Sequence, residues 1–147
     1  MDTKLQYADV PRDWAICYQT DCPLAENCLR RHVATLAPVD LRHHECVLPG
    51  ARKGDSCDCF IEKRPMRLAR GMKGLLVGIG YEQGIVLRER LFEIFGSRSQ
   101  YYRYYRGCWP ISPRQQERVA DLFRQLDVDR DPKFDAYFDG YYFDSDV

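Results

Sequence analysis

Five of the seven cysteines in this 147-residue chain fall in two short segments, and this spacing constrains the fold more than any other feature. The segment CYQTDCPLAENC contains Cys17, Cys22 and Cys28, and the segment CDC contains Cys57 and Cys59. Thiolates bind Zn²⁺ tetrahedrally and also hold iron–sulfur clusters, and either centre needs about four ligands that converge on one point. We therefore expect Cys17, Cys22, Cys28 and Cys57 to surround one metal centre, with Zn²⁺ favoured over an iron–sulfur cluster.

The spacing leaves some alternatives open. Cys59 can take the place of Cys57, because a C-x-C turn presents both sulfurs in the same region. Weaker candidate ligands are His43, His44 and Cys46, whereas Cys108 lies in another segment. The cysteines can also be small buried side chains of a core, or a reactive thiol pair. A catalytic zinc is not expected, since no H-E-x-x-H or similar motif occurs.

The start of the chain and the cysteine count bear on its compartment. The first residues, MDTKLQYADVPRDW, lack the basic start and the apolar stretch of a signal peptide. No run approaches the about 20 apolar residues that span a bilayer. An odd number of cysteines fits a disulfide framework poorly, and stable disulfides are rare in the reducing cytosol. We therefore expect a cytoplasmic protein with no membrane partner.

Apolar spacing and helix boundary residues predict a mainly α fold. The predicted helices cover residues 23–37, 65–79, 84–96, 98–106 and 113–126. Residues that favour helix starts or ends support the last three helices: Ser97 with Gln100, Ser112 with Pro113 and Gln115, and the glycines 96 and 107. Residues 38–59 are rich in Pro, Gly, Ser and Asp, and are predicted to be mostly loop.

The zero net charge hides an uneven distribution of charged residues. Residues 62–126 carry thirteen Lys or Arg against six Asp or Glu, whereas residues 127–147 carry two against seven. The acidic end alternates Asp with Phe and Tyr, which gives it too much apolar surface for a disordered tail. We expect three regions: a Cys-rich metal-binding segment (1–61), a helical region (62–126) and an acidic aromatic tail (127–147) packed on the helical bundle.

The segment GSRSQYYRYYRG, residues 96–107, combines arginines with tyrosines in the basic region. Arginine can bind phosphates or guanine edges, glutamine can pair with adenine, and tyrosine can stack on unpaired bases. On a helix, Tyr102 and Tyr105 share one face and are expected in the core. The candidate nucleic-acid-binding residues are Arg98, Gln100, Arg103, Tyr104 and Arg106. The alternative is a solvated helix whose arginines pair with Glu89 and Glu93.

Residues 83–126 resemble the helix-turn-helix of lambda-repressor-like bacterial regulators. In this resemblance LFEIFG is the end of the positioning helix, SRSQYYRYYRG is the turn with the recognition helix, and SPRQQERVADLF is the helix packed behind them. The resemblance implies a helical, helix-turn-helix-like bundle that places the side chains of the recognition helix on DNA.

The whole chain also resembles an uncharacterised family of small bacterial proteins. The resemblance rests on CPLAENCLR, YYRYYRG and the closing FDAYFDGYYF. It implies that the cysteine segment and the aromatic helix belong to one unit, and it adds no activity.

Together, these features predict a metal-binding, DNA-binding regulator or accessory factor. No nucleophile–base pair, phosphate-binding loop or carboxylate pair is visible, so we expect no enzymatic activity. The alternative is a protein-interaction module of a larger complex with a structural Zn or iron–sulfur site. The expected partners are therefore DNA or another protein.

Overall fold

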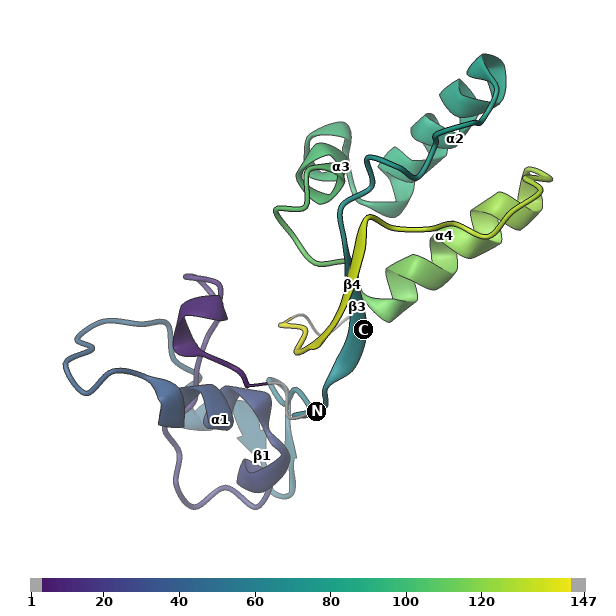
Figure 1. The fold of residues 1–147 in the computed structure, drawn as a ribbon. Coiled ribbons are helices and arrows are strands. Elements are labelled where there is room, and N and C mark those ends of the chain that lie inside the picture. The colour runs from purple at the N-terminus through teal and green to yellow at the C-terminus, as the bar shows by residue number, and fades with distance from the viewer. Residues whose placement is uncertain (1–3, 144–147) are drawn as a thin grey trace. The chain divides into compact units, whose positions relative to one another are not determined.

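The computed structural model describes residues 4–143, which form two compact units. The N-terminal unit comprises residues 4–65 together with Phe143, and the C-terminal unit comprises residues 66–142. Figure 1 labels the main helices and strands of both units. None of the helices in the described range combines the length and the apolar character that crossing a bilayer requires.

The N-terminal unit is built from short elements. They are the 3₁₀ turns η1 (Tyr7–Asp9), η2 (Ala25–Asn27) and η3 (Pro49–Ala51), the helix α1 (Leu29–Leu36) and the strands β1 (Arg52–Lys53) and β2 (Ser56–Cys57). The two strands form an antiparallel hairpin in which Arg52 pairs with Cys57. This hairpin lies in a segment for which the sequence predicted mostly loop. The buried side chains of the unit are Trp14, Ile16, Cys28, Leu29, Val33, Ala34 and Ile61.

The helix predicted for residues 23–37 is interrupted near its middle. Cys28 has an extended backbone, with φ −96° and ψ 122°, so the turn η2 ends before it and α1 begins after it. The main-chain N–H of Leu29 donates to the carbonyl of Ile61 at 2.7 Å. A hydrogen bond to a distant segment therefore replaces the intrahelical bonds that a continuous helix would make at this point.

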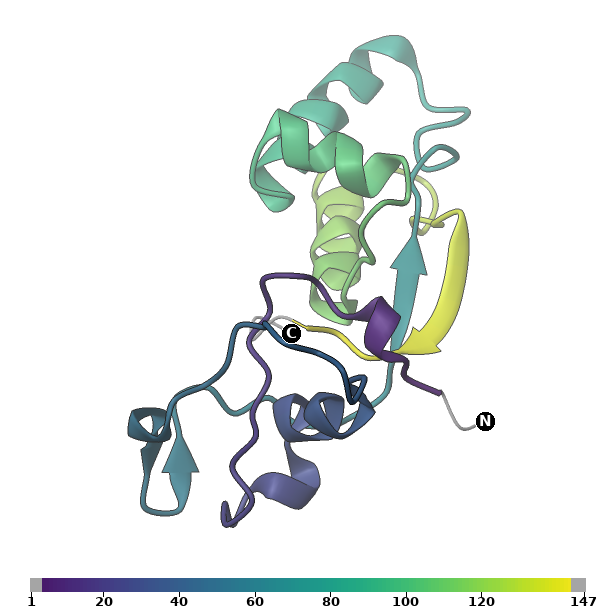
Figure 2. The same cartoon turned by 90° about the vertical axis from the view of Figure 1, so that its left-hand side faces the viewer.

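The C-terminal unit combines three helices with a two-stranded sheet. Its elements are β3 (Met66–Arg70), α2 (Tyr81–Ile94), α3 (Arg98–Tyr105), α4 (Pro113–Gln125) and β4 (Ala136–Gly140). The strands β3 and β4 run side by side in opposite directions, with Leu68 opposite Phe138 (Figure 2). Helix α2 packs against α4 and α3 (Figure 1). The core consists of Ala69, Met72, Leu75, Leu87, Leu91, Phe95, Tyr101, Ile111, Val119, Leu122, Phe123 and Phe134.

The three predicted helices after residue 80 are confirmed, and their starts show why. The Ser112 hydroxyl accepts the N–H of Gln115 at 3.2 Å, and the Gln115 side chain accepts the N–H of Ser112 at 2.9 Å. This capping box satisfies two donors that the first turn leaves unpaired. At the start of α3 the Ser97 hydroxyl accepts the main-chain N–H of Gln100 at 3.2 Å, which is one of the two bonds of a capping box. Gly107 follows α3 with φ +81°, a conformation that glycine adopts without strain.

The expectation of a mainly α, helix-turn-helix-like bundle is wrong, because the fold is mixed α/β with two small antiparallel sheets. The clearest difference is the helix predicted for residues 65–79. Its first part is the strand β3, and Gly71 then turns the chain with φ +83°. The apolar residues of this segment match a helical period, but their main-chain groups pair with β4 about 70 residues later. Local spacing alone could not show that partner.

The described part of the acidic tail contributes a strand and a core side chain. Phe134 is buried in the core of the C-terminal unit. The Asp135 carboxylate accepts the main-chain N–H groups of Lys73 and Gly74, at 2.8 and 2.9 Å. On the sheet, the Arg67 guanidinium lies 3.5 Å from the Asp139 carboxylate. The tail is therefore tied to the turn after β3 and to β3 itself, and residues 144–147 lie outside the described range.

Candidate functional site

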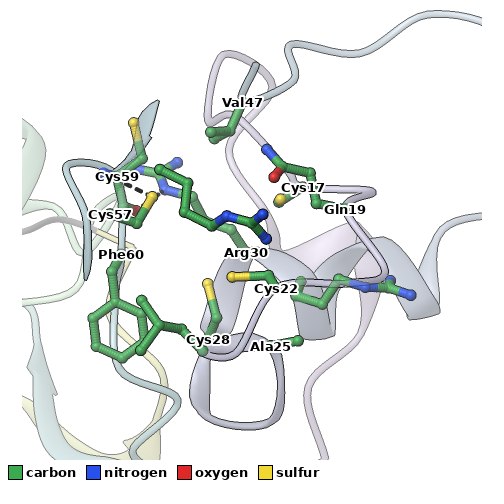
Figure 3. A pocket seen from close by; sticks show the side chains of 13 residues that line it. Cys17, Gln19, Cys22, Ala25, Cys28, Arg30, Val47, Cys57, Cys59 and Phe60 are labelled. Carbon is green, nitrogen blue, oxygen red and sulfur yellow. Dashed lines mark hydrogen bonds between the residues drawn. The ribbon is translucent and has the colours of Figure 1, made fainter. Parts of the chain in front are cut away.

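Five cysteines line a single pocket of the N-terminal unit, shown in Figure 3. They are Cys17, Cys22, Cys28, Cys57 and Cys59, so all four predicted metal ligands and the alternative fourth ligand line the same space. The pocket is small, with a volume of about 20 Å³. The weaker candidates His43, His44 and Cys46 are not in its wall, and neither is Cys108.

A tight turn brings Cys22 and Cys28 together. Pro23 follows Cys22, and the main-chain N–H of Ala25 donates to the Cys22 carbonyl at 3.1 Å. The N–H of Cys28 in turn donates to the Ala25 carbonyl at 3.4 Å. These bonds fold the chain back within seven residues, and Figure 3 shows the sulfurs of Cys22 and Cys28 pointing toward one another.

The hairpin supplies the other cysteine pair. Cys57 ends β2, and the main-chain N–H of Cys59 donates to the Cys57 sulfur at 3.4 Å. In Figure 3 the Cys59 sulfur points away from those of Cys22 and Cys28. The bond orients the Cys57 sulfur within the hairpin end, so the two cysteines of the C-x-C segment are not equivalent.

Arginines give the pocket a positive wall. Arg30, Arg31 and Arg52 line it together with the cysteines. A hydrogen bond with Cys22 and the nearby Asp21 carboxylate, 3.5 Å away, raise the pKa of Arg52 above its ordinary value. These guanidinium groups are fixed positive charges at neutral pH in the wall of the pocket. No sequence pattern singles out these arginines, because their proximity to the sulfurs depends on the tertiary fold.

The cysteines share a pocket, but they do not form an assembled metal centre. Within residues 4–143, no group of three or more Cys, His, Asp or Glu side chains is arranged to hold a metal ion. The expectation of a fold that already contains such a centre is therefore wrong. The arrangement is a set of thiols gathered around a small space, without the tetrahedral geometry that Zn²⁺ adopts.

The five candidate nucleic-acid-binding residues fall into two groups. Arg98, Arg103 and Arg106 are exposed on α3 and its C-terminal end. Gln100 is also exposed, but its side-chain oxygen accepts the Ser97 hydroxyl at 3.4 Å as part of the helix start. The fifth residue, Tyr104, is half-buried and packs against Phe95, the residue that follows α2.

The tyrosines of α3 match the prediction in part. Tyr101 is the buried one, with 1% of its surface exposed, whereas Tyr102 and Tyr105 are half-buried. Burial raises the pKa of Tyr101 above its ordinary value. Tyr104 packs its ring 4.7 Å from that of Phe95, and its hydroxyl accepts the Gln115 side-chain amide at 3.3 Å. Tyr102 and Tyr105 thus pack against the core as expected, but Tyr101 is the tyrosine of α3 that is fully buried in it.

The arginines of α3 have aromatic neighbours instead of carboxylate partners. The Arg103 guanidinium lies 5.0 Å from the centre of the Trp109 ring, and that of Arg98 lies 6.0 Å from the Tyr102 ring. In the described part of the chain, no ion pair involves Arg98, Arg103 or Arg106. The alternative in which these arginines pair with Glu89 and Glu93 is therefore not seen.

Comparison with known proteins places the whole chain in one family. No curated protein and no solved structure matches it. A family model, described as a family of unknown function and labelled DUF6078, matches residues 1–143 and so covers both the cysteine segment and the aromatic helix. The predicted resemblance to an uncharacterised family is confirmed, and the chain belongs to DUF6078, a family of unknown function.

Proposed function

We propose that this protein binds one Zn²⁺ through Cys17, Cys22, Cys28 and Cys57, and that this site is structural rather than enzymatic. The observation that carries the proposal is the convergence of five cysteines from two separate segments of the chain on one small pocket. Cysteines that serve only as small core side chains are buried. Of these five, Cys28 alone is buried, and the other four are half-buried around the pocket. A core role does not explain that placement.

The ligand set suits a thiolate-bound metal. Four cysteine thiolates are the ligands of structural Zn²⁺ sites, and they also hold iron–sulfur clusters. Zn²⁺ is the first choice, since it needs a single central ion, and an iron–sulfur cluster is the alternative.

The charge of the pocket supports thiolate ligands. Four thiolates around one divalent cation leave a net negative charge, which is costly to hold in a partly buried site without nearby positive charge. Arg30, Arg31 and Arg52 supply positive charge at the pocket wall. The positive wall thus complements the negative charge of a zinc–thiolate centre. It repels a free cation that has no thiolate ligands.

Binding in this proposal is coupled to closure of the N-terminal unit. Cys22 and Cys28 flank the short turn η2, Cys57 and Cys59 lie at the end of the two-residue strands of the hairpin β1–β2, and Cys17 lies in an irregular segment. Small movements of these elements can bring four sulfurs to the about 2.3 Å Zn–S distance. Metal binding then contributes to the folding free energy of this unit, as in other small metal-bound domains.

Elemental analysis together with a visible absorption spectrum tests the proposal. Protein purified anaerobically from cells should contain about one equivalent of zinc and no visible absorption, whereas a brown chromophore would identify the iron–sulfur alternative. A stable protein that carries neither metal, and that takes up no zinc when reduced, would contradict both.

A second candidate function is contact with nucleic acid through the exposed arginines of α3. Residues 94–116 contain no Asp or Glu, and they carry Arg98, Arg103, Arg106 and Arg114, all exposed. Unpaired arginines beside half-buried rings suit phosphates and bases. With the metal site, this gives a DNA-binding regulator or accessory factor that works in the cytoplasm. Salt-sensitive binding to DNA supports it, and salt-insensitive binding to a protein partner favours an interaction module.

A further inference from the structure

One side chain connects all the segments that carry the candidate ligands. The Arg30 Nε donates to the Cys59 carbonyl at 2.7 Å, and Nη1 donates to the Ala15 carbonyl at 2.6 Å. The carbonyl of Arg30 also accepts the main-chain N–H of Cys17 at 3.2 Å. Arg30 itself lies on α1, two residues after Cys28. It therefore joins the Cys17 segment, the α1 start and the hairpin end.

The guanidinium of Arg30 is held in place by an aromatic ring as well. Its central carbon lies 4.5 Å from the centre of the Trp14 ring, and Trp14 is 8% exposed. A planar guanidinium can stack on a ring while its N–H groups donate in fixed directions, which the flexible ammonium of lysine cannot reproduce. The two carbonyl acceptors and the ring together fix the position and the orientation of this charge.

We propose that Arg30 is the positioning residue of the cysteine site. It sets the separation between the Cys17 segment and the hairpin, and it places a positive charge beside the thiolates, without touching the metal. This inference rests on the proposed zinc function. It goes beyond that function because it assigns the assembly of the ligands to one residue outside the ligand set.

Arg31 provides a matched comparison. It is the next residue on α1, it lines the same pocket, and it carries the same charge. Within the described residues, Arg31 has none of the side-chain bonds to main-chain carbonyls that Arg30 has. Arg52 is less suitable as a control, because its contacts with Asp21 and Cys22 also join two segments.

The experiment compares Arg30→Lys with Arg31→Lys in the full chain, so that the side-chain charge is kept in both. Reduced protein is titrated with Co²⁺ against a competing chelator, and the sulfur-to-cobalt absorption reports the number of thiolate ligands. Groups that orient metal ligands typically contribute roughly 10–100-fold in affinity. Arg30→Lys should therefore weaken Co²⁺ binding by about tenfold or more and lower the absorption per bound ion, while Arg31→Lys, which keeps its charge and loses no such bond, should weaken binding by less.

The outcomes separate this inference from the zinc proposal. If the wild type forms no cobalt–thiolate species, the zinc proposal fails and the role of Arg30 fails with it. If the wild type binds Co²⁺ and Arg30→Lys binds it equally well with the same spectrum, only the role of Arg30 is overturned. Should circular dichroism show that Arg30→Lys does not fold, Trp14→Leu replaces it. That variant removes the ring and keeps both hydrogen bonds, and unchanged Co²⁺ affinity there overturns the inference.

Discussion

The main-chain N–H of Cys59 donates to the sulfur of Cys57, with 3.4 Å between nitrogen and sulfur. This bond makes the two cysteines of the C-x-C segment unequal, since one sulfur receives a donor and the other points away from Cys22 and Cys28 (Figure 3). Hydrogen bonds from main-chain N–H groups stabilise a thiolate and orient it for a metal. This bond favours Cys57 as the proposed ligand, for which the spacing left Cys59 as the alternative.

The first prediction follows from this inequality. Cys57→Ser should lower zinc affinity strongly, because it removes a ligand, whereas Cys59→Ser should keep about one zinc per chain, because the donor N–H remains in the main chain. Zinc content and competition titration of the two purified variants provide the measurement. A larger loss for Cys59→Ser than for Cys57→Ser would reverse the ligand assignment.

A second prediction concerns the other ligands. Cys22→Ser and Cys28→Ser should each release the zinc and destabilise the N-terminal unit, since metal binding and folding are coupled in such sites. Cys108→Ser is the matched control, because Cys108 is exposed in the C-terminal unit and outside the pocket. Elemental analysis and thermal unfolding of the three variants check this, and equal zinc content in all three would exclude the site.

The third prediction concerns the exposed Arg103. Arg103→Ala should change folding stability by no more than about 0.5 kcal/mol, as is usual for surface positions. If the arginines of α3 contact phosphates, the same change should weaken DNA binding similarly for every sequence. It should also reduce the slope of log K against log salt concentration by about one. Arg124, which is also exposed but pairs with Asp121, is the control. If Arg103→Ala and Arg124→Ala weaken DNA binding equally, the arginines of α3 contribute no more to DNA contact than other exposed arginines.

The fourth prediction tests the packing of the acidic tail. Phe134 is 4% exposed in the core of the C-terminal unit, whereas its neighbour Lys133 is exposed. Phe134→Ala should cost about 3–5 kcal/mol of unfolding free energy, because it removes a buried ring and leaves a cavity. Lys133→Ala should cost less than about 0.5 kcal/mol. Chemical denaturation gives both values, and a small effect of Phe134→Ala would mean that the tail does not pack.

The fifth prediction uses two glycines of opposite character. A Cβ on Gly71 would lie 2.6 Å from the Asp135 carboxylate oxygen, and its φ is +83°. Gly71→Ala should therefore destabilise the C-terminal unit by more than about 1 kcal/mol, through left-handed strain and loss of the Asp135 contacts. Gly84 lies within α2, and a Cβ added there would have no neighbouring atom within 4 Å. Gly84→Ala should stabilise by up to about 1 kcal/mol, so the two melting temperatures should move in opposite directions.

Local interactions between residues close in the sequence allowed parts of the fold to be predicted correctly. The helices α3 and α4 begin where their serines accept main-chain N–H groups three residues later, as at Ser112 and Gln115. Their ends follow equally local preferences, such as the left-handed conformation of Gly107. The chemistry of the cysteines also indicated which side chains belong together, and their role as ligands stays a prediction.

Elements whose hydrogen-bonding or packing partners are distant in the sequence could not be predicted from local patterns. Met66–Arg70 is a strand because its main-chain groups pair with Ala136–Gly140, and no local pattern shows that partner. Tyr101 rather than Tyr102 is buried, because the covered face of α3 depends on the position of α2. Arg30 joins the cysteine segments through main-chain carbonyls, which every residue carries and no side-chain pattern marks. Hydrogen bonds to the main chain over long sequence separations are invisible in composition and spacing, and here they determine both the sheet and the geometry around the cysteines.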